Sequence, residues 1–176
     1  EVSRAIELST RLLRFYTGKG AVPYGDHPAW TETHEDNGKC GMAAVLFSRL
    51  GEANGADFFT RMAVASHGSE RDCGHTGNYF NLLWSLPAIA QAGPHATGAW
   101  MQEFGAWYHD LARRWDGAFT HQGPPEPGHD SYRGWDATGA YLLGYALPLK
   151  TIALAGRKPG LVQPLAPAAA QRLLRD

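Results

Sequence analysis

The sequence predicts an all-α fold, an array of about three helical hairpins that forms a partial α/α toroid. Three segments align without gaps on Gly41, Gly77 and Gly139, and each leads from a loop into an apolar helix. Segments with the spacing of amphipathic helices lie between them. No segment alternates polar and apolar residues over a useful length, so strands are not expected.

The three repeated segments are expected to form buried inner helices. In each of them a loop precedes the aligned glycine, and a helix-ending residue follows nine or ten positions later. The segments are apolar nearly all round, which is typical of enclosed helices. We therefore expect them to run parallel in the interior. The expected starts lie at 38–41, 74–77 and 136–139, and the expected stops are Gly51, Pro87 and Pro148.

One-sided amphipathic helices are expected between the buried ones. The first runs from about Val2 to Tyr16, and a shorter one follows Asn54. The third begins at Pro94, a residue suited to a first helical turn, and ends at about Trp115. The side chains expected to face inward are Ile6, Leu12, Leu13 and Phe15 in the first helix, Phe58, Phe59 and Met62 in the second, and Trp100, Phe104, Trp107, Leu111 and Trp115 in the third.

Alternating outer and inner helices predict a curved two-layer array with a functional rim. Parallel inner helices all start at one edge, so the loops 18–40, 67–76 and 116–138 should gather there. Most of the histidines lie in these loops, which favours a polar site on this rim. The six rim histidines are His27, His34, His67, His75, His121 and His129.

Composition narrows the classes of protein and partner. Residues 1–156 are expected to form one helical domain, followed by a Pro-rich tail with a short helix at 157–176. Sixteen basic and seventeen acidic residues give a net charge of −1 without a basic run, so no nucleic-acid partner is expected. No apolar run reaches the roughly 18 to 20 residues of a membrane span, so no membrane partner is expected. Localisation is unknown, and a secreted or periplasmic location would follow from processing of a longer precursor.

Two parts of the sequence resemble known toroids. Segments 115–124 and 135–145, where a Gly-aromatic turn precedes an apolar helix, resemble the repeat of terpenoid-cyclase and protein-prenyltransferase-like proteins. Segments 34–47, 75–84 and 115–147 resemble an uncharacterised bacterial family in which a PDZ domain precedes such a toroid. That resemblance implies that this chain is the C-terminal part of a toroid of up to six hairpins. It implies no established reaction, and the sequence lacks the acidic clusters of isoprenoid enzymes.

The first candidate constellation surrounds the start of the second inner helix. Asp72, Cys73 and His75 place a carboxylate, a thiol and an imidazole within one turn. A helix start lowers the pKa of a thiol, so an exposed Cys73 could be a nucleophile or a metal ligand. The approach to the neighbouring helix could complete a zinc shell with His34, Glu35, Asp36 and Cys40. The structural alternative is that the acids brace loop N–H groups, the cysteines fill space and His75 bonds a carbonyl group.

The second constellation, residues 129–136, lies in the last long loop and has the residue types of a sugar-binding site. Aromatic platforms and paired carboxylates are typical of carbohydrate sites, and glycosidases use two carboxyl groups roughly 5 to 10 Å apart. Acids at Glu35 or Asp36, Asp72 and Asp136 precede adjacent inner helices, so that separation is reachable. In a lyase, Tyr132 or His75 would remove the proton. The structural alternative is that the aromatic residues pack the loop and Asp136 makes a local turn.

The sequence therefore predicts a carbohydrate-active hydrolase or lyase site on the rim. The alternatives are a non-catalytic module that binds a glycan or peptide, and a zinc-dependent transferase or hydrolase that uses Asp72, Cys73 and His75. No cofactor is expected, with zinc as the one candidate. Expected partners are a small molecule or glycan and the rest of the toroid, a PDZ domain or a second copy. The candidate catalytic residues are Asp72, His75, Asp136, Tyr132 and Glu35, the substrate-binding ones are His34, Asp36, Arg133, Trp135 and His121, and the metal ligands are Cys73 and Cys40.

Overall fold

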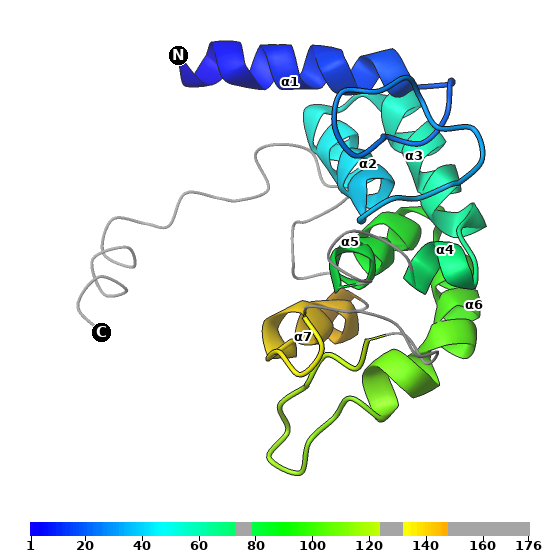
Figure 1. Ribbon diagram of the computed structural model, residues 1–176, viewed down its shortest axis with the longest axis vertical. Coiled ribbons are helices and arrows are strands. Elements are labelled where there is room, and N and C mark those ends of the chain that lie inside the picture. The colour runs from blue at the N-terminus through cyan, green and yellow to red at the C-terminus, as the bar shows by residue number, and fades with distance from the viewer. Residues whose placement is uncertain (73–78, 124–131, 148–176) are drawn as a thin grey trace.

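A computed structural model describes the chain at residues 1–72, 79–123 and 132–147, and shows it as a stack of helices (Figure 1). Within these ranges the backbone forms helices and three isolated antiparallel bridges but no strand, so the predicted all-α class is confirmed. None of the described helices is both long and apolar enough to cross a membrane. The helices are α1 (Val2–Tyr16), α2 (Lys39–Leu50), α3 (Ala53–Ala65), α4 (Ser69–Asp72), α5 (Tyr79–Ile89), α6 (Pro94–Gly105) and α7 (Thr138–Ala146), with a 3-10 turn η1 (Ala90–Ala92) and a π-helical turn η2 (Ala106–Asp110).

Helix α2 lies at the centre of the core and packs against α3 and α5. Two glycines permit its close approach to α5, because Gly38 faces the Phe80 carbonyl group and Gly41 faces that of Trp84. The later glycine of the α2 segment contacts the later residue of α5, so α2 and α5 run parallel as expected. Close packing of small and aromatic side chains fills the space between the helices. The fully buried residues of this core include Cys40, Ala43, Ala44, Phe47, Phe59, Ala63, Ala88 and Ile89.

The predicted starts and stops of the inner helices have different outcomes. Helix α2 begins at Lys39 and ends before Gly51, and α7 begins at Thr138, so these predictions are confirmed. The predicted start at 74–77 lies outside the described residues. The predicted stop at Pro87 is wrong, because α5 continues through this buried proline to Ile89 before the chain tightens into η1. Helix α7 is less enclosed than predicted, since Tyr141 is its one buried residue.

The prediction that four apolar side chains of the first helix face inward is confirmed for Leu13, which packs against the core, and is wrong for the other three. Helix α1 has the predicted bounds, but Ile6, Leu12 and Phe15 are each about half exposed. Figure 1 shows why, because α1 crosses the α2–α3 end of the stack and its first turns extend beyond it. Its C-terminal end is the anchored part, where the buried Tyr16 donates a hydrogen bond to the His27 carbonyl oxygen over 3.0 Å.

The helix predicted to reach Trp115 ends earlier. Regular α6 stops at Gly105, the turn η2 follows, and the chain then enters antiparallel bridges that pair Arg113 with Phe119 and Thr120 with Asp136. These bridges carry the backbone away from the helix axis, so the apolar periodicity no longer describes one face. Trp115 is accordingly 95% exposed instead of buried, and Leu111 is also exposed.

Candidate functional site

Glu35 closes the start of α2. Its side chain is only 3% exposed, and its Oε1 accepts hydrogen bonds from the N–H groups of Asp36 (2.8 Å) and Cys40 (3.0 Å). Its Oε2 accepts the N–H group of Gly41 over 3.0 Å. The first N–H groups of a helix have no partner within it, so both oxygens of Glu35 satisfy donors that would otherwise be unpaired. Burial nevertheless raises the pKa of the carboxyl group, because it outweighs these bonds.

Arg71 is a fully buried cation that sequence reasoning missed. Its Nη2 donates to the carbonyl oxygens of Ala63 (2.6 Å) and Ser66 (3.3 Å), and its Nη1 donates to the Ser85 hydroxyl group. The positive charge also favours ionisation of Glu35 and partly opposes the effect of burial on its pKa. Arg71 therefore ties the end of α3 to α5. Charged side chains are mostly exposed, so nothing in the sequence marked this one as buried.

Two predicted substrate-binding residues have charged partners on the rim. The His34 Nδ1 lies 3.0 Å from a carboxylate oxygen of Glu70, and the Lys39 ammonium group lies 2.7 Å from Asp36. Burial opposes the ionisation of Glu70, but the His34 backbone N–H group and imidazole outweigh it and lower its pKa. Glu70 was not among the predicted residues, because its partner lies 36 positions away in the sequence.

Cys40 is a free, buried thiol. The Val22 N–H group donates to its Sγ over 3.4 Å, and burial raises the thiol pKa well above its ordinary value. Within the described ranges, no three His, Cys, Asp or Glu side chains are grouped to hold a metal ion. Cys73 and His75 lie outside the described residues, as does the tail 157–176. Asp72 is the last residue of α4, and its side chain is likewise not described.

Three aromatic side chains form what we call the aromatic platform, made of Tyr79, Tyr132 and Trp135. Tyr132 stacks on Tyr79 at a centroid distance of 5.7 Å and meets the Trp135 ring edge to face at 4.2 Å. Trp135 is 53% exposed. Beneath the platform, the buried His121 contacts Tyr79 and places its Nδ1 3.1 Å from the Tyr141 hydroxyl group. The platform thus has a buried base and an exposed edge.

Asp136 and Arg133 lie beside the aromatic platform. The Thr138 N–H group donates to the Asp136 Oδ1 over 2.9 Å, and the Thr138 N–H and hydroxyl groups lower the carboxyl pKa. Burial raises the pKa of Tyr79, and the negative charge of Asp136 adds to this effect. The exposed Arg133 donates its Nε–H to the Gln122 carbonyl oxygen over 2.8 Å. Five predicted residues, His121, Tyr132, Arg133, Trp135 and Asp136, are therefore brought together.

The first described turn of α5 joins the Glu35 cap to the aromatic platform. The Gly38 N–H group donates to the Asn81 Oδ1 over 3.0 Å, and the Phe80 ring meets Tyr132 at a centroid distance of 5.9 Å. Tyr79, Phe80 and Asn81 were not predicted as site residues. The aromatic pair that begins two positions after the repeated Gly77 was the signal that could have identified Tyr79 and Phe80.

Comparison with known proteins identifies a family for this chain but assigns it no reaction. The profile of a family described as "Domain of unknown function (DUF6288)" matches residues 1–156. No curated protein and no solved structure matches the chain. A function for this chain therefore has to be inferred from the residues of the rim.

Proposed function

We propose that this chain, which belongs to the DUF6288 family, binds a glycan on the aromatic platform of its rim without cleaving it. The observation that carries the proposal is the half-exposed Trp135, held edge to face by Tyr132, with Asp136 and Arg133 beside it. A sugar ring has an apolar face and a perimeter of hydroxyl groups. A rigid aromatic surface with polar groups at its edge complements both features.

The described acids favour binding over hydrolysis. A glycosidase needs two carboxyl groups that face the scissile bond, roughly 5 to 10 Å apart. Glu35 is buried and uses both oxygens on backbone N–H groups, and Asp136 accepts the first N–H group of α7. A catalytic alternative would rest on Asp72 or His75, and a zinc-dependent alternative on Cys73.

Replacing Trp135 by alanine should weaken glycan binding at least tenfold. A central aromatic anchor commonly contributes about 2 kcal/mol or more to binding, and about 1.4 kcal/mol corresponds to a factor of ten. The glycan is first selected on an array, and its dissociation constant is then measured by calorimetry. Trp115→Ala is the matched control, because Trp115 is more exposed but lies outside the platform. Equal affinities for the two variants would contradict the proposal.

Turnover of the selected glycan distinguishes the non-catalytic proposal from its alternatives. We expect no product after prolonged incubation with the wild-type protein. Product formation that is lost in Asp72→Asn or Asp136→Asn would replace the proposal by a hydrolase or lyase. About one zinc ion per chain in elemental analysis, lost in Cys73→Ser, would favour the zinc-dependent alternative.

We also propose that a partner covers the two apolar ends of the array, with a second copy, the rest of a toroid or a PDZ domain as the candidates. The exposed face of α1 and the exposed Leu142 and Tyr145 of α7 lie at opposite ends of the stack (Figure 1). Several large apolar side chains exposed on one element favour an interface there. The large exposed side chains of α1 are Val2, Ile6, Leu8, Leu12 and Phe15.

With a second copy as the partner, we expect association that increases with protein concentration in sedimentation experiments. The double variant Ile6→Ser, Leu12→Ser should reduce this association, because it removes two large apolar side chains from the face. Met42→Ser is the control, since Met42 is an exposed apolar residue that lies on α2 near its start and not on α1. A wild-type protein that stays monomeric at high concentration would exclude the second copy as the partner.

A further inference from the structure

A buried histidine joins the turn η2 to helix α7. His109 is 2% exposed, and its ring stacks on Tyr141 of α7 at a centroid distance of 4.8 Å. It meets the ring of Tyr145, one turn further along α7, nearly at a right angle at 5.3 Å. It also meets Trp100 of α6 in this way, at 5.7 Å. Aromatic rings of two helices therefore surround the imidazole.

One nitrogen of this imidazole has no partner in the described part of the chain. The His109 Nδ1 is buried and makes no hydrogen bond there. A neutral imidazole carries a proton on one nitrogen, whereas the imidazolium ion carries N–H donors on both. Protonation would therefore bury a charged donor without an acceptor, which costs more free energy than burying the neutral ring.

The rings of α7 do not supply the missing acceptor. The Tyr141 hydroxyl group lies 3.1 Å from the His121 Nδ1, so it is already engaged. The face of the Tyr141 ring attracts a cation but accepts no conventional hydrogen bond from it. Burial and the charge of Asp110 raise the pKa of Tyr145, so its hydroxyl group stays neutral in the range where a histidine titrates.

Two charged side chains act on this cluster with opposite signs. Asp110, the exposed neighbour of His109 in η2, favours the imidazolium ion. Arg113 acts on Tyr145 with a positive charge, which disfavours a second cation in the cluster. Burial outweighs Asp110 and lowers the pKa of His109 below its ordinary value of 6.5. The folded contact therefore favours the neutral ring.

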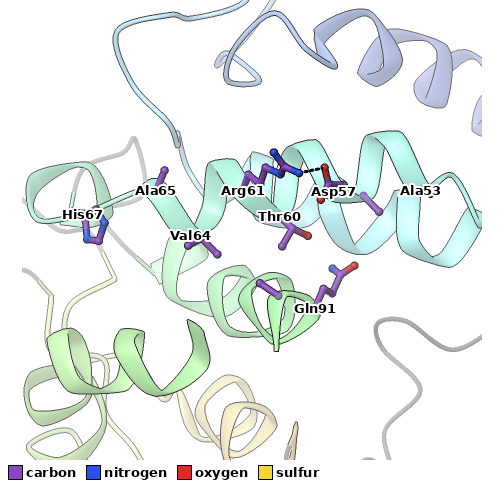
Figure 2. Close-up of a pocket in the computed structure, with 10 residues that line it drawn as sticks. Ala53, Asp57, Thr60, Arg61, Val64, Ala65, His67 and Gln91 are labelled. Atoms are coloured by element: carbon purple, nitrogen blue, oxygen red, sulfur yellow. Dashed lines mark ion pairs between the residues drawn. The ribbon is translucent and has the colours of Figure 1, made fainter. Parts of the chain in front are cut away.

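Two other histidines have surroundings that favour a proton. His67 lies beside an open hollow of about 640 Å³ between α3 and η1 (Figure 2), and its mostly exposed ring places Nδ1 2.9 Å from Glu103. His34 is paired with Glu70 over 3.0 Å. A proton on either ring meets a carboxylate, so acid does not weaken these contacts in the range where histidine titrates. The contact of His109 responds to acid in the opposite direction.

The contact between His109 and Tyr141 continues to the aromatic platform. Tyr141 meets the Nδ1 of His121 through its hydroxyl group, and the His121 ring contacts Tyr79 at a centroid distance of 5.3 Å. The loop that carries the other two rings of the platform leads directly into α7, which begins at Thr138. A displacement of α7 would therefore remove the packing beneath the platform.

We propose that protonation of His109 opens the contact between η2 and α7 and loosens the aromatic platform, so that acid weakens glycan binding there. Only this last step rests on the proposed function. The proton is taken up as the contact opens and the imidazole meets water. The contribution of the contact to stability is complete above about pH 6.5 and is lost as the pH falls through the folded pKa. An imidazole in water is protonated about thirtyfold in excess at pH 5, so the open form gains at most about thirtyfold relative to pH 8.

The test is amide hydrogen exchange of the full chain at pH 8 and pH 5, followed by mass spectrometry. Each rate is divided by the intrinsic rate of an unstructured peptide at the same pH. We expect exchange in α7 to accelerate by at least about fivefold at pH 5. Exchange in α2 should change by less than about twofold, because α2 meets α5 through backbone contacts at Gly38 and Gly41 that carry no titratable group.

His109→Phe keeps a flat ring against Tyr141 but cannot be protonated, so it should abolish the acceleration in α7. His95→Phe is the matched control, because His95 is exposed on α6, and it should respond like the wild type. The proposal is overturned if α7 of the wild type does not respond to acid, or if the response persists in His109→Phe.

If His109→Phe does not fold, an NMR titration of the wild-type imidazoles takes its place. The His109 signals should then titrate below pH 6.5 together with a change of the Tyr141 ring signals, and titration at or above that pH would overturn the proposal.

Glycan affinity distinguishes this proposal from the proposed function. The affinity of the wild type should fall by at least about fivefold from pH 8 to pH 5, and that of His109→Phe should not. Equal affinities of the wild type at both pH values would overturn the coupling of His109 to the platform. A chain that binds no glycan at either pH would overturn the proposed function alone, because the exchange test uses no glycan.

Discussion

Replacing Glu35 by alanine is expected to destabilise the protein by about 3–5 kcal/mol, because two backbone N–H groups in the first turn of α2 and that of Asp36 in the preceding loop lose their acceptor inside the protein. Glu35→Gln keeps one acceptor oxygen, but its NH₂ group must face an N–H donor, so an intermediate loss is expected. Urea unfolding followed by circular dichroism measures both. The control is Glu52→Gln, because Glu52 pairs with Arg14 at the surface, where solvent screens the ion pair and its loss should change the free energy of unfolding little. Equal losses for Glu35→Ala and Glu52→Gln would contradict the capping role.

The pH dependence of the free energy of unfolding should identify the ionisation of Glu35. Its pKa in the folded protein is raised above the ordinary value of 4.5, so the folded state binds more protons than the unfolded state between these values. The stabilisation from this group is therefore complete below about pH 4.5 and is lost as the pH rises through the folded pKa. Glu35→Gln removes this dependence. The free energy of unfolding that Glu35→Gln loses relative to the wild type should be larger below about pH 4.5 than above the folded pKa of Glu35. A loss that grows as the pH rises would contradict the assignment to Glu35.

Arg71→Ala should be comparably damaging, by about 3–5 kcal/mol, because it leaves the carbonyl oxygens of Ala63 and Ser66 without their buried donor. Arg71→Lys keeps the charge but not the planar set of donors, so it should recover only part of the loss. The measurement is again urea unfolding. Arg61→Ala is the control, because Arg61 is exposed and pairs with Asp57 within one helix turn, which is worth about 0.3–0.5 kcal/mol. A loss below 1 kcal/mol in Arg71→Ala would show that the buried guanidinium is dispensable.

The sequence predicted where helices begin better than it predicted what covers them. The bounds of α1 and the end of α2 follow from local signals, namely apolar spacing and a glycine after the last turn, and the start of α2 follows from the aligned repeat. Burial depends on neighbours that are distant in sequence, so Ile6 and Leu12 satisfied the helical pattern and yet remain exposed. For Trp115, the spacing continued past η2, where the backbone had already left the helix.

The repeat located the rim, but it could not assign individual roles to the acids. Asp36 and Glu35 are adjacent, and the loop decides which one reaches the helix start. Asn37 and Gly38 both adopt left-handed backbone conformations, with φ of 52° and 72°, which turn the chain back so that Glu35 covers the first turn of α2. The aromatic platform was predicted in part, because Tyr132 and Trp135 lie close together in one loop of the sequence. Tyr79, which was not predicted, comes from the distant helix α5.

The glycine contacts between α2 and α5 make the rim a rigid unit. A Cβ at Gly38 would lie 2.2 Å from the Phe80 carbonyl oxygen, and one at Gly41 would lie 2.9 Å from that of Trp84. These are backbone atoms, which cannot rotate away as a side chain could. The spacing between the helix that Glu35 caps and the helix that carries Tyr79 is therefore fixed before any ligand arrives. A ligand that meets a preformed surface loses less free energy to ordering the protein, so modest contacts on the platform suffice for measurable affinity.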